Sequence, residues 1–140
     1  MSCVILLAAD HPMPLYDPEL RRVTVSGGFT LETPGFSVQA HEYYRDAVDS
    51  LGLEMKPFQY ELNLDATDED AEQLRTYLET NGTPGEQVEL WNLWVGDDRE
   101  THVPHFRGRL VDLDVDTLDQ LCNPPVRNYI PGQCRMTITI

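Results

Sequence analysis

The residues best suited to chemistry are gathered in one loop, GDDRETHVPH, at residues 96–105. His102 and His105 stand three apart in this loop and share it with three acidic residues. Imidazole nitrogens and carboxylate oxygens are common ligands of divalent cations, so the pattern indicates a metal site at these two histidines. No second motif at a fixed spacing accompanies them, and a solvated hairpin tip is the competing interpretation.

A second acidic stretch, LVDLDVDT, places a carboxylate at every second position. Asp112, Asp114 and Asp116 have the spacing that opens a calcium-binding loop, but the sixth position is Thr117 and the twelfth is Asn123. Glycine and a bidentate glutamate are needed there. The stretch is also similar to the nucleophile motif of haloacid-dehalogenase-type phosphatases, but no lysine follows it. We therefore assign it neither calcium binding nor phosphoryl transfer.

The remaining reactive side chains form no nucleophilic arrangement. The three cysteines, Cys3, Cys122 and Cys134, have no regular spacing, which argues against a disulfide framework. Two of them fall in strand patterns, where a buried and inert thiol is expected. Glycine-rich phosphate loops and paired Cys-x-x-Cys motifs are missing from the sequence. We expect no catalysis and no cofactor.

The charge of the chain restricts its partners. The net charge is −14, with a single lysine against nine arginines. Such a surface repels nucleic-acid phosphates and anionic lipids, which leaves a basic protein as the expected partner and is compatible with self-association. Solubility alone is the competing explanation of the acidity. The apolar stretch Cys3–Ala9 is too short to span a membrane and has no basic leader, so we expect a cytoplasmic protein.

The clearest elements lie in the middle of the chain. FQYELNL, residues 58–64, alternates between apolar and polar residues and predicts a half-buried strand. The helix that follows is predicted to begin after Thr67, with acidic residues in its first turn, and to end at Asn81-Gly82. Further along, the sequence predicts a strand at 88–96, another from His105, a short helix ended by two prolines, and a final alternating strand.

From residue 57 onward the predicted order is strand, helix, strand, strand, helix, strand. This order favours an α+β fold with a ferredoxin-like βαββαβ unit over residues 57–140. Residues 1–56 are expected to form an N-terminal β-rich extension with one helix, over residues 40–51, packed on that unit. Because 140 residues suit one core, the chain 1–140 is predicted to be a single domain.

In the ferredoxin-like arrangement both helices start at the same end of the sheet. Nine carboxylates would then crowd one rim, as a docking surface for a basic partner or as compensation of the helix dipoles. The binding residues predicted on this rim are Asp68, Asp70, Asp116 and Asp119.

The strand VELWNLWVG is apolar on both sides. Trp91 and Trp94 are three apart and must point to opposite faces, yet the strand is predicted to lie at an edge of the sheet. Its second apolar row requires a cover, and three are considered: the N-terminal segment, a β-bulge near Asn92 that re-aims Trp94, or a partner protein. Both tryptophans are therefore candidate binding residues.

These observations favour a small acidic cytoplasmic protein that binds another protein without catalysis, as an inhibitor or an immunity-type protein does. The alternative is a small-molecule- or metal-binding enzyme with a pocket near Trp91, His102 and His105, between the N-terminal segment and the sheet.

Overall fold

The computed structural model describes residues 2–96, 102–126 and 130–140. These residues form a mixed α+β fold, as the sequence predicts. The main sheet has six strands, β1 (Ser2–Ala9), β4 (Ser37–Ala40), β5 (Phe58–Asn63), β6 (Gln87–Val95), β7 (His105–Arg109) and β8 (Cys134–Thr139). A separate hairpin joins β2 (Arg21–Ser26) and β3 (Phe29–Pro34). The helices are α1 (Arg45–Asp49), α2 (Asp68–Asn81) and α3 (Val115–Cys122), with a 3-10 turn, η1 (Leu110–Asp112), before α3.

The strand order differs from the predicted ferredoxin-like unit. The observed order is β4-β5-β1-β6-β8-β7, so β5 and β7 are not the parallel neighbours that the ferredoxin-like arrangement requires. The N-terminal strand β1 lies between β5 and β6 and pairs antiparallel with both. Because β1 is apolar on both sides, an interior position that covers both of its faces is favourable. The N-terminal segment is thus partly the centre of the sheet, not an extension packed upon it.

The prediction that VELWNLWVG lies at an edge is wrong for the same reason. Strand β6 pairs with β1 on one side and with β8 on the other, and both registers run without an interruption, so no β-bulge occurs near Asn92. The assignment of its two faces is confirmed: Val88 and Leu90 belong to one buried cluster, and Trp91 and Leu93 belong to another.

One face of the sheet is covered by α2 and α3. The helix α2 begins where the sequence predicts, because the side chain of Thr67 accepts a hydrogen bond from the backbone N–H of Asp70. Asp114 caps α3 in the same way through Thr117. Leu74 and Leu118 are fully buried between these helices and the sheet. None of the helices in the described part of the chain has the length and apolar content needed to cross a membrane.

The opposite face is covered by residues 41–56, which confirms the N-terminal cover over Trp91. Val48 of α1 is buried with Trp91, and Leu51 packs against the same cluster. The helix is shorter than the predicted 40–51 for two reasons: β4 extends as far as Ala40, and the side chain of Glu61, on β5, binds the segment between β4 and α1. The Oε2 atom of Glu61 lies 2.9 Å from His41 Nδ1 and accepts a hydrogen bond from the backbone N–H of Tyr44.

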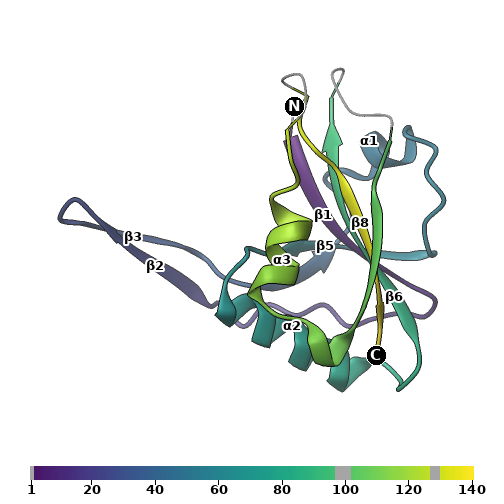
Figure 1. The fold of residues 1–140 in the computed structure, drawn as a ribbon, viewed down its shortest axis with the longest axis horizontal. Coiled ribbons are helices and arrows are strands. Elements are labelled where there is room, and N and C mark those ends of the chain that lie inside the picture. Colours follow the sequence, from purple (N-terminus) through teal and green to yellow (C-terminus); the bar gives the residue numbers. More distant parts are fainter. Residues whose placement is uncertain (1, 97–101, 127–129) are drawn as a thin grey trace.

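The β2–β3 hairpin projects away from the rest of the chain (Figure 1). We call it the arm and define it as residues 21–34. Its turn consists of Gly27 and Gly28, both with positive φ, which suits a tight two-residue hairpin. The sequence predicts the two strands but not that they leave the sheet.

Candidate functional site

The two histidines of the predicted metal site do not converge. His105 is paired with Arg135 in the parallel register of β7 and β8, on the face opposite to Phe106. Its Nε2 atom lies 2.8 Å from Thr137 Oγ1. His102 instead lines a pocket on the helix-covered face together with Phe106. Among the described residues, no three His, Cys, Asp or Glu side chains are grouped so that they could hold a metal ion. The acidic partners in the predicted loop, Asp97, Asp98 and Glu100, lie outside the described residues.

The surroundings of His105 are cationic. Burial lowers the pKa of His105, and the guanidinium groups of Arg135 and Arg107 lower it further. The guanidinium of Arg135 also lies 5.0 Å from the ring centroid of Trp91, a cation–π distance. Thr137 beside it is buried. Burial and the two guanidinium groups lower the pKa of His105 more than the carboxylate of Glu89 raises it, so a cation would on balance be repelled here.

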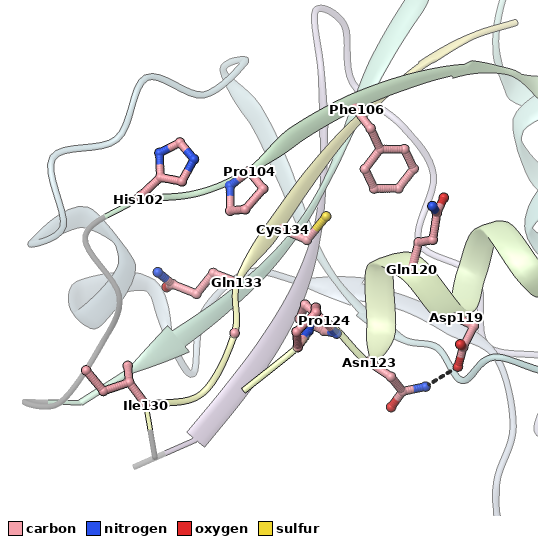
Figure 2. Close-up of a pocket in the computed structure, with 12 residues that line it drawn as sticks. His102, Pro104, Phe106, Asp119, Gln120, Asn123, Pro124, Ile130, Gln133 and Cys134 are labelled. Atoms are coloured by element: carbon pink, nitrogen blue, oxygen red, sulfur yellow. Dashed lines mark hydrogen bonds between the residues drawn. The ribbon is translucent and has the colours of Figure 1, made fainter. Parts of the chain in front are cut away.

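A pocket of about 540 Å³ lies between α3, β7 and β8. Figure 2 shows Phe106 and Cys134 on the strand side and Gln120 and Asn123 on α3. The predicted pocket near Trp91 and both histidines is therefore wrong in its position. Of those three residues only His102 lines this pocket, because Trp91 and His105 lie on the other face of the sheet.

Three polar residues of this pocket, Asp119, Asn123 and Gln133, already have partners. The Nδ2 group of Asn123 donates to Asp119 Oδ1 at 2.8 Å, and Gln133 Oε1 accepts from the backbone N–H of Trp94. Burial raises the pKa of Cys134 to about 11, so its thiol is protonated at neutral pH and is a poor nucleophile. What the pocket offers is an apolar volume, suited to binding and not to bond making.

The predicted acidic rim is assembled only in part. β5 runs parallel to β6, whereas β7 and β8 run in the opposite direction, so β5 and β7 end at opposite ends of the sheet. Asp119 of α3 nevertheless lies near the start of α2, because burial raises the pKa of Cys122 and the carboxylates of Asp65, Asp70 and Asp119 together raise it further. Asp68, Asp116 and Asp119 are exposed, but Asp70 is buried and cannot receive a partner.

The two tryptophans also lack a binding surface of their own. Trp91 is buried under residues 41–56, which excludes a partner protein as its cover. Trp94 is half-buried on the face of the sheet that the helices cover, where its backbone N–H is bonded to Gln133. Neither is available to a partner in the way that the sequence predicts.

The arm is the feature that the sequence patterns missed. It exposes four large apolar side chains, with Phe29 80 % and Val25 71 % accessible, and Val23 and Leu31 about as open. A free two-stranded hairpin is at best marginally stable in water. Arg22 fastens this one to α2, because its guanidinium forms an ion pair with the buried carboxylate of Asp70. The sequence signal that could have identified the arm is the alternation of its two strands, which places apolar residues on both faces of the hairpin, where no other segment covers them.

Comparison of the chain with protein-family models, with curated proteins and with solved structures finds no match. The function must therefore be argued from the geometry alone.

Proposed function

We propose that this chain is a non-catalytic protein-binding module that engages its partner through the arm, residues 21–34. The observation that carries the proposal is the exposure of Phe29, Leu31, Val23 and Val25 on a projecting hairpin. Apolar patches of this kind are characteristic of interaction sites, since burying each such side chain is worth about 1.5–3 kcal/mol.

The arm is also held ready for binding. The ion pair between Arg22 and Asp70 and the hydrogen bond from Arg22 Nη1 to the Pro34 carbonyl, at 2.7 Å, fix both strands at its base. A binding element that is ordered in advance loses less conformational entropy on association. A role of this chain as an inhibitor or an immunity-type protein is consistent with its small size and its one rigid projection.

The negative net charge supports a basic protein as a partner of the rest of the chain, outside the arm, which we call the body. The exposed carboxylates Asp68, Asp116 and Asp119 belong to a chain with a net charge of −14, which would speed the approach of a basic protein.

A photo-crosslinking amino acid at position 29 tests the proposal in the cell that produces the protein. We expect crosslinks to a protein from position 29, and none from position 111, because Val111 is similarly exposed but lies in η1 on the body. Equal crosslinking from both positions, or none from position 29, would contradict the proposal.

A second function, the binding of an apolar small molecule, is favoured by the pocket of about 540 Å³ beside Phe106. Its volume lies in the range of small-molecule sites. Indole is a suitable probe, and Phe106→Trp should fill the pocket and abolish the binding of indole without unfolding the protein. Binding that persists unchanged in this variant would exclude the pocket as its site.

A further inference from the structure

The arm has two distinct faces. In an antiparallel hairpin, directly paired residues project to the same side, so Phe29 and Leu31 lie on the face that carries Arg22. Val23 and Val25 lie on the other face. Because Arg22 reaches across to α2, its face is the one turned toward the body, and we call it the inner face. The inner face therefore presents a phenyl ring near the tip and an ion pair at the base.

A hollow of about 270 Å³ lies at the base of the arm, between the arm and the first turns of α2. Leu20 and Phe36 supply apolar walls, while Glu72 and Gln73 of α2 border it. Arg21 and Arg22, from the two faces of the arm, both line the hollow at its base, and Arg22 does so on the same side as Phe29.

The length of the arm decides whether the side chain at its tip can reach the hollow of the same chain. Strands of six residues extend roughly 20 Å, so Phe29 of one chain cannot reach the hollow of its own base. Two arms that lie antiparallel, inner face to inner face, would place each tip over the base of the other. A two-fold contact needs a surface that is complementary to itself, and a ring at one end with a hollow at the other satisfies this condition.

The chain exposes more surface than a compact monomer of its size. Its accessible surface is 8264 Å², whereas a compact monomer of 16.0 kDa is expected to have about 7400 Å². Such an excess is expected of a chain with a projecting element, whose exposed apolar side chains a contact between two copies would bury.

The electrostatic repulsion between two copies of the chain is smallest at the arm. Residues 21–34 contain Arg21, Arg22 and Glu32 as their charged side chains, whereas the whole chain carries −14. Contact through the arms lets two acidic bodies stay apart. Their repulsion should still be felt, so added salt should strengthen association of the chain with itself and weaken association with a basic protein.

We propose that the occupant of the inner face is a second copy of this chain, with the two arms crossed antiparallel and each Phe29 seated in the hollow beside Leu20 of the other copy. This inference rests on the proposed function, in which the arm is a protein-binding surface. It adds the identity of the partner and the way in which the arm is seated.

Sedimentation equilibrium of the full chain tests the association. We expect a monomer–dimer equilibrium that tightens with salt, and Phe29→Thr should weaken it by roughly a hundredfold or more, because the symmetric dimer loses two buried aromatic side chains. Val25→Thr is the matched control, because it makes the same replacement near the tip on the outer face and should leave the equilibrium unchanged. A chain that stays monomeric at every concentration and salt, or a dimer indifferent to Phe29→Thr, would overturn the proposal.

Disulfide trapping tests the seating of the tip. In a Cys3→Ser background, a mixture of Phe29→Cys and Glu72→Cys chains should form a covalent dimer containing one of each, because a disulfide requires Cα atoms within about 7 Å. Glu79→Cys is the control partner: it lies on the same side of α2, two turns or about 10 Å further on, and should not be trapped. Equal trapping at both positions would contradict the crossed arrangement.

The two proposals fail separately. A strictly monomeric chain whose position 29 crosslinks to a different protein would refute the second copy and leave the arm as a binding surface. A chain whose position 29 crosslinks to nothing and that does not dimerise would refute both.

Discussion

Arg22 and Asp70 join the arm to the helix that flanks it. The Nε atom of Arg22 lies 3.4 Å from Asp70 Oδ1, and Nη2 contacts Oδ2 of the same carboxylate. Oδ2 also accepts a hydrogen bond of 2.7 Å from the backbone N–H of Asp65. The carboxylate therefore fixes the start of α2 and the root of the arm together.

Asp70→Asn should destabilise the fold considerably. Removing one partner of a buried ion pair costs about 3–5 kcal/mol when the other charge stays buried without compensation. Arg22 is partly exposed and keeps a second ion pair with Asp65, at 3.1 Å, so the expected loss lies at or below the lower end of this range. Unfolding in urea measures it, and Asp68→Asn, exposed in the same helical turn, should change stability little. Similar effects of both substitutions would show that the ion pair has no special weight.

A fragment of residues 57–140 should not fold. It contains the predicted βαββαβ order, but it lacks β1, so β5 and β6 would lose the strand that joins them. Leu6 and Leu7 of β1 are fully buried on opposite faces, and the loss of such side chains costs about 2–5 kcal/mol each. Circular dichroism and size-exclusion chromatography would detect the disorder or aggregation of the fragment. A monomeric fragment with a cooperative melting transition would contradict the central role of β1.

Asn92→Ala should loosen α3. The Nδ2 group of Asn92 donates to the carbonyl oxygen of Leu121 at 2.8 Å, and a second carbonyl of the last helical turn lies 3.3 Å away. These buried carbonyls would lose their donor, at a cost of about 1–3 kcal/mol. Asn123→Ala is the control, since its hydrogen bond to Asp119 is exposed. Urea midpoints that shift equally for both variants would contradict the assignment.

His11 should make stability depend on pH. Its hydrogen bond to the Pro12 carbonyl raises the pKa of His11, and the carboxylate of Glu86, 2.6 Å from Nε2, raises it further. Because the folded pKa lies above the ordinary value near 6.5, this stabilisation is complete below that pH and disappears as pH rises through the folded pKa. NMR titration should show a lower pKa for His11 in Glu86→Gln, and an unchanged pKa would exclude the ion pair as a cause.

Local patterns predicted the elements well because the residues that decide them are close together in the sequence. Thr67 marks the start of α2, and the alternation around Leu62 marks β5, without any information from distant residues. The end of α2 at Asn81 follows in the same way from the glycine after it. Strand order could not be predicted like this, because it depends on which distant strand buries β1.

The candidate sites were predicted less well for a related reason. His102 and His105 are close in sequence, but only His105 belongs to β7. The segment before β7 directs His102 to the helix-covered face, whereas the pairing of β7 with β8 places His105 on the other face. In the sequence Asp70 cannot be told apart from its exposed neighbour Asp68, whereas in the structure Asp70 is buried in an ion pair with Arg22 of the arm. Sequence patterns identify a chargeable group but not the distant residue that neutralises it.

The central position of β1 also bears on the order in which the chain can be completed during synthesis. Ile5 pairs with Leu62 and with Asn92, so β1, which is synthesised before both of its neighbours, must wait for them to leave the ribosome. Pairings between residues so far apart in the chain slow folding and leave apolar strand edges open in the meantime. We therefore expect the nascent chain to depend on chaperones until β6 has emerged.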